Sequence, residues 1–321
     1  MRFAPVCCVV LALASGCQWM KNGHVEPRTN SPFAGPMPER TSAELVGYLN
    51  RQAGLLRSIS YDDVRAVATE NGRELGSLND SSLFSSQPRS FRLIGAHSLA
   101  GTMIDIGSND REFWMYAKPL GRDNYFYCSH DAFSTGEVKF PIPFDTDWVM
   151  QALGMSPYDP NAAYEVKANR EQAAYVLYQR TKTRTGLPVV KTTVFNADWA
   201  DGKKPAVRKH VIFDERDPKT PIASAEIVAA KTVSLPGGGY VQAPTEVILE
   251  WPQQQFKMTM KLGRERINED LGDRAASLFN KPTIRGTSPI DLAKYQFVIP
   301  SSYRGQAPDR QRSYRLPTFW K

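Results

Sequence analysis

Alternation of apolar and polar residues, which places successive side chains on opposite faces of a strand, is the dominant pattern along this chain. The clearest case is residues 256–262 (FKMTMKL), where every second side chain is apolar. Other short runs bounded by turn residues predict further strands. These runs are residues 64–69, 91–93, 103–106, 113–116, 174–178, 189–195, 207–213, 225–230 and 247–251.

Two segments have helical spacing instead. Leucines at 45, 49, 55 and 56, with Tyr48 between them, form a stripe that predicts a helix beginning at Thr41 or Ser42, and Glu44 completes a capping box with Thr41. A shorter helix is expected from Asp145 to about Leu153.

The predicted fold class is therefore mainly β (α+β). Residues 103–116 predict a hairpin, because Gly107–Asp110 supply turn residues between two apolar runs. We expect one large curved antiparallel sheet with one solvated face and one apolar face. Since only a few helices are available to cover the apolar face, the sheet should form a half-barrel with a groove beneath the helices.

The N-terminus has the pattern of a bacterial lipoprotein signal. Residues 13–17 (LASGC) follow Arg2 and an apolar run too short to span a bilayer. This predicts a signal peptide at residues 1–16, a lipidated Cys17, and a proline-rich tether over residues 17–40. An ordinary secretory signal cut near the same place is the alternative. The domain itself is expected over residues 41–300.

The net charge limits the expected classes of binding partner, and the cysteine content limits the possible disulfides. The formal net charge is +7, and loss of Arg2 with the signal lowers it to +6. An exported basic chain meets anionic lipid head groups more often than nucleic acid, so no nucleic-acid partner is expected. Cys128 is the only cysteine after Cys17, which excludes an intramolecular disulfide.

The chain carries little that predicts catalysis. It has no Gly-x-Ser-x-Gly or His-Glu-x-x-His motif, and its four histidines lack metal-ligand spacing, so we expect no catalytic residue, metal or cofactor. His130, near Cys128 and Asp131, is the nearest approach to a cluster, and a loop role explains it. Asp105 lies within an apolar strand and needs a partner if buried; pairing with an arginine on a neighbouring strand explains it as well as catalysis does.

Large and flexible apolar side chains suggest a ligand cavity. Methionine and aromatic linings suit a ligand of variable shape such as an acyl chain. The expected lining, drawn from both faces of the 103–116 hairpin, is Phe91, Leu93, Ile104, Ile106, Trp114, Met258 and Met260. The alternative is that these residues form an ordinary packed core.

Residues 301–321 form a basic tail with interleaved aromatic residues. This composition suits anionic lipid head groups at a membrane interface. A tail that packs along the sheet edge explains it equally well.

Several segments together resemble the outer-membrane lipoprotein-sorting superfamily, that is, the LolA/LolB-like carriers and receptors. The matching segments, within residues 41–285, are 45–50 (LVGYLN), 91–93 (FRL), 105–109 (DIGSN) before 113–114 (FW), 267–268 (IN) and 278–282 (LFNKP). The resemblance implies an open β-barrel with a helical lid that binds acyl chains in a hydrophobic cavity without catalysis. The chain is longer than a typical carrier and has a lipidation signal of its own, which fits a membrane-bound receptor better than a shuttle.

The leading hypothesis is thus a membrane-anchored, non-enzymatic binder of lipid or lipoprotein acyl chains, acting in lipoprotein sorting at the outer membrane and facing the periplasm. The first alternative keeps the same fold but changes the role: an envelope sensor or scaffold lipoprotein that binds another envelope protein. A hydrolase of envelope lipid or glycan is the third. An open apolar cavity favours the first hypothesis, a filled one favours the second, and a converging Ser–His or carboxylate pair favours the third.

Overall fold

The computed structural model describes residues 37–97, 101–118, 125–135, 138, 146–199, 204–272 and 274–294. The helices are α1 Ser42–Leu55, α2 His130–Ser134, α3 Thr146–Ala152, the 3-10 helix η3 Pro252–Gln254 and α4 Arg274–Leu278. The strands are β1 Ser58–Glu70, β2 Arg73–Ser86, β3 Ser90–His97, β4 Gly101–Ser108, β5 Glu112–Ala117, β6 Tyr125–Ser129, β7 Tyr164–Asn169, β8 Ala174–Lys182, β9 Pro188–Asn196, β10 Val207–Asp214, β11 Asp217–Ser234, β12 Tyr240–Trp251, β13 Phe256–Ile267 and β14 Pro289–Asp291.

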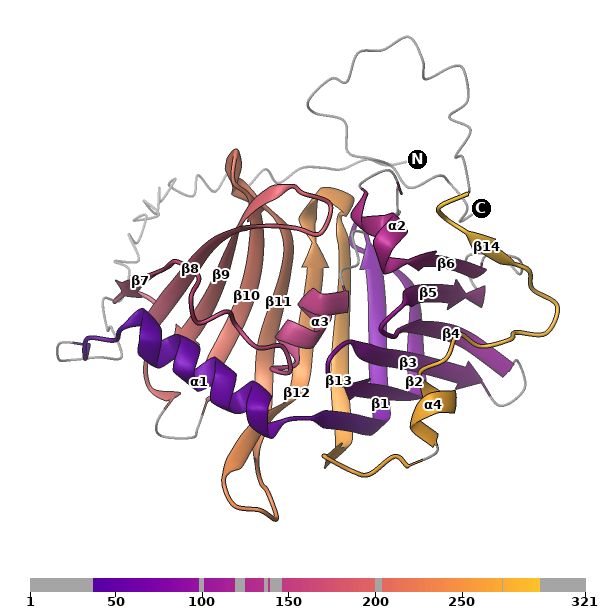
Figure 1. Cartoon of the computed structure of the whole chain (residues 1–321), viewed down its shortest axis with the longest axis horizontal. Coiled ribbons are helices and arrows are strands. Elements are labelled where there is room, and N and C mark those ends of the chain that lie inside the picture. Colours follow the sequence, from indigo (N-terminus) through magenta and orange to yellow (C-terminus); the bar gives the residue numbers. More distant parts are fainter. Residues whose placement is uncertain are drawn as a thin grey trace, which may run out of the picture.

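All these strands belong to one open sheet, in the order β14-β6-β5-β4-β3-β2-β1-β13-β12-β11-β10-β9-β8-β7. Every pairing is antiparallel except that of β14 with β6. The sheet curves so strongly that β3–β6 run nearly across the direction of β8–β13, and α1 and α3 lie inside the curve (Figure 1). The predicted fold class, a large curved antiparallel sheet with few covering helices, is confirmed.

The alternation predicted at residues 256–262 sets the two faces of this sheet. Met260 and Leu262 of β13 are buried on the concave face, opposite Ala66 and Val64 of β1, whereas Lys257 is exposed on the convex face. On that convex face β13 pairs with β12 through an ion pair of 3.2 Å between Lys257 Nζ and Glu250 Oε1. At β13, one face of the sheet is therefore apolar and the other solvated, as expected.

Helix α1 begins with the predicted capping box. The Glu44 N–H donates to Thr41 Oγ1 at 3.2 Å, and the Thr41 N–H donates to Glu44 Oε2 at 2.7 Å. Leu45 and Leu49 are buried against β8 and β9, so α1 closes one end of the concave face. The predicted boundary needs a small correction here, since Met37 is buried and Tyr175 Oη donates to Pro38 O at 2.5 Å. The packed domain thus includes at least four residues assigned to the tether.

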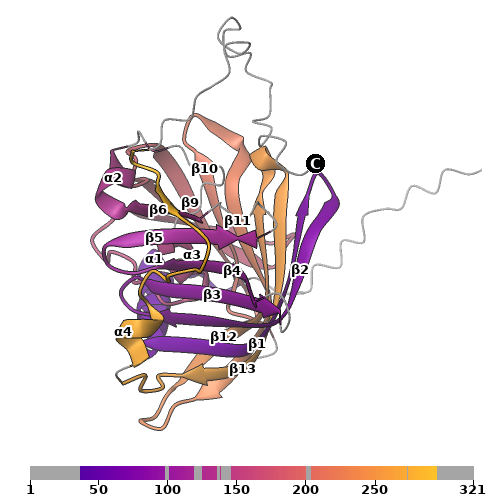
Figure 2. The ribbon, with the colours of Figure 1, turned by 90° about the vertical axis from the view of Figure 1, so that its right-hand side faces the viewer.

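The opposite side of the sheet has its own cover. Residues 274–294, here called the C-terminal strap, run from α4 across the convex face of β3–β6 and end in β14 (Figure 2). The strap includes residues 278–282 (LFNKP). No helix within the described residues is long and apolar enough to cross a membrane. Cys17 and residues 301–321 lie outside the described residues.

Candidate functional site

The concave face brings together most of the residues predicted to line a cavity. Phe91 and Leu93 of β3 and Met260 of β13 are buried in one apolar core, against which Ile106 and Met258 pack partly exposed. Ile104, two residues before Ile106 on β4, is half-buried and faces the same side.

Helix α3 fills the centre of this face. Four large side chains on α3 and just after it are buried in the same core as Leu93 and Met260. They are Trp148, Met150, Leu153 and Met155. The Trp148 ring meets the Trp251 ring edge to face, with centroids 5.8 Å apart. The apolar space that the sequence predicts between sheet and helices is therefore occupied, in this structure, by side chains of a seven-residue helix and of the residues just after it.

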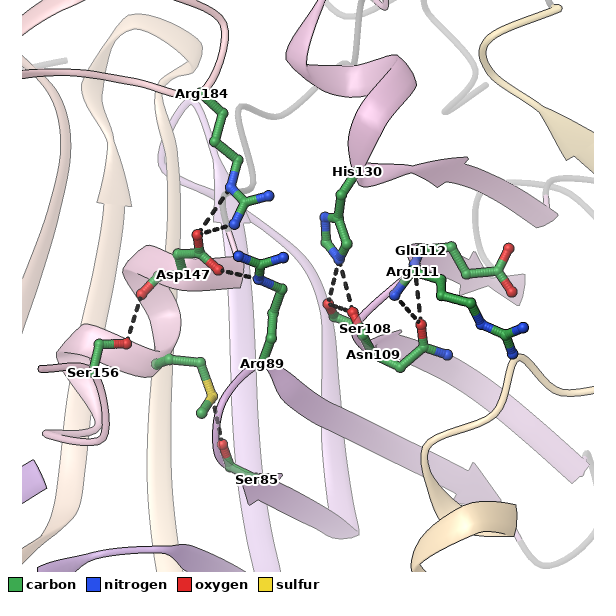
Figure 3. Close-up of polar contacts among 11 residues, drawn as sticks. Ser85, Arg89, Ser108, Asn109, Arg111, Glu112, His130, Asp147, Ser156 and Arg184 are labelled. Atoms are coloured by element: carbon green, nitrogen blue, oxygen red, sulfur yellow. Dashed lines mark hydrogen bonds and ion pairs between the residues drawn. The ribbon is translucent and has the colours of Figure 1, made fainter. Parts of the chain in front are cut away.

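One polar atom in this packing is unsatisfied. The indole Nε1 of Trp148 is buried and donates to no residue that the structure describes. A buried donor without an acceptor costs about 1–3 kcal/mol. By contrast, Ser85, which lies under α3, donates its hydroxyl to Met150 Sδ at 2.7 Å (Figure 3). The position of α3 seen here thus leaves one donor available on the concave face.

Ion pairs between side chains hold the N-terminal end of α3. Asp147 lies between two arginines that come from different hairpin turns of the sheet (Figure 3). Arg89, between β2 and β3, donates its Nε to Asp147 Oδ1 at 2.9 Å, and Arg184, between β8 and β9, donates its Nε to Asp147 Oδ2 at 2.9 Å. The carboxylate also sits in the first turn of the helix, where negative charge is stabilised. We call Asp147, Arg89 and Arg184 the arginine clamp.

The C-terminal end of α3 is held differently. Gly154, with φ +76°, ends the helix in the left-handed conformation that suits glycine. Beyond it, Gln87 Nε2 donates to Met155 O at 2.8 Å, and Asn50 of α1 binds both the N–H and the C=O of Tyr158, at 2.7 and 3.0 Å. This end is therefore fixed through main-chain atoms, whereas the other end depends on side chains.

His130 and Ser108 form the only close Ser–His pair recorded within the described residues, 3.3 Å apart. His130 Nε2 also lies 2.8 Å from Asn109 O, and only a protonated Nε2 can bind a carbonyl oxygen. Nε2 therefore cannot take the serine proton. Burial lowers the pKa of His130, and the charges of Arg184 and Arg89 lower it further against the opposing effect of the Asn109 bond. The pair is a structural contact rather than an activated nucleophile.

A second buried histidine lies beneath the chain that follows α3. His210 Nδ1 lies 3.3 Å from Thr193 Oγ1 and 3.4 Å from Tyr158 Oη, and these two oxygens are 2.9 Å apart. Burial lowers the pKa of His210 to about 4, and the charge of Lys191 adds to this effect. His210 is therefore neutral at pH 7 and joins Tyr158 to the sheet.

Trp114 is the one predicted cavity residue that lies on the other face. It pairs with Gly107 in the ladder, out of phase with Ile106, and packs with Tyr116 and Tyr125 on the convex face. Its Nε1 donates to Asp105 Oδ1 at 2.9 Å. The predicted list thus spans both faces, because alternation shows which residues share a face but not which face is covered.

Asp105 has the arginine partner that the sequence suggests. Arg92 on β3 donates its Nη2 to Asp105 Oδ2 at 2.7 Å and its Nε to Oδ1 at 3.1 Å. Arg92 also donates its Nη1 to Leu278 O at 2.6 Å, which ties the strap to the sheet. The carboxylate is therefore a structural anchor of the convex face.

The described residues include no group of three or more His, Cys, Asp or Glu side chains placed to hold a metal ion. Cys128 is buried and free, and burial raises the pKa of its thiol to about 11. Sequence reasoning missed the arginine clamp. Its only local signal is an acidic residue in the first turn of a predicted helix, because both arginines are distant in sequence.

No protein-family model and no curated protein matches the chain. Among solved structures it is similar to a protein domain from Vibrio parahaemolyticus named for outer membrane lipoprotein sorting, with 9% identity over 72% of this chain and 94% of that one, at a TM-score of 0.48. A DUF1329 family protein from Desulfovibrio piger follows, with 10% identity, 74% and 97% coverage and a TM-score of 0.47. A LolA superfamily protein from Nitrosomonas europaea has 12% identity, 74% and 97% coverage and a TM-score of 0.43.

Proposed function

We propose that this chain is a membrane-anchored, non-enzymatic binder of lipid or lipoprotein acyl chains, which occupy the concave face when α3 moves aside. The observation that carries the proposal is the cover of that face: a seven-residue helix with a buried, unsatisfied indole N–H lies over a large apolar surface. Each methylene that an acyl chain buries there contributes about 0.8 kcal/mol, so a long chain can replace the contacts of α3.

The two ends of α3 suit this movement. The arginine clamp holds the N-terminal end through side chains at the rim of the sheet, while main-chain bonds at Met155 and Tyr158 fix the other end. Breaking the clamp lets the helix swing about Gly154 without detaching it. In the open position Trp148 Nε1 donates to an ester or amide oxygen of the ligand.

The proposed location rests on the sequence. Acylation at Cys17 anchors the chain in the outer membrane facing the periplasm, and residues 18–36 act as the tether. Replacement of Cys17 by Ser should release the chain from membranes and stop labelling by a clickable fatty acid. Persistence of the variant in membranes, together with an unlabelled wild type, would exclude acylation.

A second function is favoured by the same helix. Because α3 fills the concave face, a scaffold or sensor that binds another envelope protein needs no lipid at all. A hydrolase has less support, since Nε2 of His130 is committed to Asn109 O and cannot activate Ser108.

Binding of a fluorescent fatty acid to the full chain separates these functions. Met258 is half-buried on the concave face, and Thr259 beside it on β13 faces the convex side. Met258→Asp should abolish binding, because an acyl chain on the apolar face would bury the new carboxylate without a partner. Thr259→Asp should leave binding unchanged, and circular dichroism should show both variants folded. A wild type that binds no fatty acid, or equal binding by both variants, would favour the scaffold.

A further inference from the structure

A pocket of about 620 Å³ lies on the convex side of the sheet, beneath the C-terminal strap. Strands β3, β4 and β5 form its floor, and strap residues 282–287 form one wall. The strap lies on the opposite side of the sheet from α3 (Figure 2), and the pocket does too, because Arg92, Ile94 and Asp105 alternate with Leu93 and Ile106, which face α3. Its occupant therefore need not be an acyl chain, and it can bind whether or not the concave face does.

The side chains around this pocket carry net positive charge. Arg92, Lys118 and Arg285 each contribute one positive charge, and Asp105 contributes one negative charge. Asp105 is itself neutralised by its bidentate pair with Arg92, so its charge does not repel an anion strongly. Arg285 remains as a positive charge that can face a ligand.

Hydrogen-bond donors to a ligand come from both the sheet floor and the strap wall of the pocket. Arg285 makes no hydrogen bond or ion pair with any residue that the structure describes, and the same holds for the hydroxyls of Thr102 and Thr283. A guanidinium has five N–H groups, and Arg92 uses three of them for Asp105 and Leu278 O. A ligand with several anionic oxygens can accept from these groups together, which a phosphate does better than a single carboxylate.

The size of the pocket and its apolar side chains add a second requirement. The volume is many times the roughly 30 Å³ share of one water molecule, so an inorganic ion alone leaves it largely empty. Ile94 and Ile284 also line it and suit the carbon skeleton of a ligand. We propose that this pocket binds a glycerophosphate group, either as a lipid head group or as a free phosphate ester.

Titration calorimetry of the full chain in a phosphate-free, non-ionic detergent tests the proposal. The two probes are glycerol 3-phosphate and the short-chain lipid dihexanoylphosphatidylglycerol. Arg285→Ala should weaken binding about tenfold, the effect of losing one charge-assisted hydrogen bond. Arg73→Ala is the matched control, because it removes an exposed arginine at the start of β2 and leaves the pocket intact.

If both probes bind, the free phosphate ester is sufficient for binding. If only the lipid binds, the ligand is a lipid head group. Either result supports the proposed pocket, provided that Arg285→Ala weakens the binding and Arg73→Ala does not. Met258→Asp, on the concave face, should change neither affinity, which keeps this test separate from that of acyl-chain binding. Failure of both probes to bind at millimolar concentration, or equal losses in Arg285→Ala and Arg73→Ala, would overturn the proposal.

Discussion

The two faces of the sheet are covered in opposite ways. On the convex face, sheet side chains donate to main-chain carbonyls of the strap: Arg92 to Leu278 O at 2.6 Å, Asn109 to Phe279 O at 3.0 Å and Tyr125 to Pro282 O at 2.8 Å. On the concave face, the described residues of helix α3 contact the sheet through apolar side chains, the hydrogen bond from Ser85 to Met150 Sδ and the arginine clamp.

This difference has a consequence for movement. Detaching the strap breaks these three hydrogen bonds, one of them from the charged Arg92, and hydrogen bonds to charged groups contribute more to stability than neutral ones. Helix α3 can leave with its internal main-chain hydrogen bonds intact once the clamp and the Ser85–Met150 bond break, provided that another apolar group takes its place. The comparison therefore assigns a permanent cover to the convex face and an exchangeable one to the concave face.

The largest expected effect is on the strap. Arg92→Met leaves the Asp105 carboxylate, 3% exposed, without its ion partner. Loss of one partner of a buried pair costs about 3–5 kcal/mol, so urea unfolding should show a drop of that size. Lys257→Met, which breaks the exposed pair with Glu250, should cost less than about 1 kcal/mol. The double variant Arg92→Met with Asp105→Leu should recover much of the loss. A single variant as stable as Lys257→Met would show that the strap is not anchored by this pair.

The chain after α3 should respond to pH through His210. The folded pKa of about 4 lies below the usual 6.5, so between these values the unfolded chain binds more protons and stability falls as pH falls. The full effect amounts to about 3 kcal/mol, reached near pH 4 and absent above pH 6.5. His210→Gln should lose less stability than the wild type over this range in urea titrations. Parallel pH profiles for the two proteins would contradict a neutral, buried His210.

The arginine clamp should have a smaller effect on stability and a clear one on movement. Asp147 is about one-third exposed, so Asp147→Ala should cost only about 1 kcal/mol. Opening of α3 should become roughly fivefold more frequent, which hydrogen exchange of its amides measures. Glu215→Ala, which breaks the exposed contact with Arg180 at 3.5 Å, is the control. Unchanged exchange in α3 would show that the clamp does not hold the helix.

The sequence predicts the ion pair that supports the strap better than the one that holds α3, because the ion-pair partners lie at different distances along the chain. Asp105 stands out in an apolar strand, and Arg92 is only 13 residues away on the neighbouring strand, so pairing with an arginine could be anticipated. Asp147 pairs with residues 58 and 37 positions away on two separate turns, and alternation says nothing about such distances. The clamp is therefore visible only in the folded chain.

The same limit explains the strands that the pattern does not predict. The first half of β2 (RELGSLND) is largely polar because it extends beyond the core, and β7 at the sheet edge is exposed on one face and only half-buried on the other. In contrast, β13 alternates cleanly because its two faces meet an apolar core and water. Periodicity thus reports burial, and it fails where a strand leaves the core.

Two buried tryptophans, one on each face, allow the finest test of the comparison. Trp114 donates its N–H to Asp105 on the convex face, and Trp148 on α3 has no acceptor among the described residues. Trp114→Phe should cost about 2–4 kcal/mol, because it removes a bond to a buried carboxylate as well as ring volume.

Trp148→Phe should change the free energy of unfolding by less than about 1 kcal/mol, since the gain from removing an unsatisfied donor offsets the lost volume. If this N–H donates to a bound ligand, the same variant should weaken fatty-acid binding several-fold while urea unfolding stays nearly constant. Equal stability losses in the two variants would mean that both indoles are satisfied, and α3 would then be as permanent a cover as the strap.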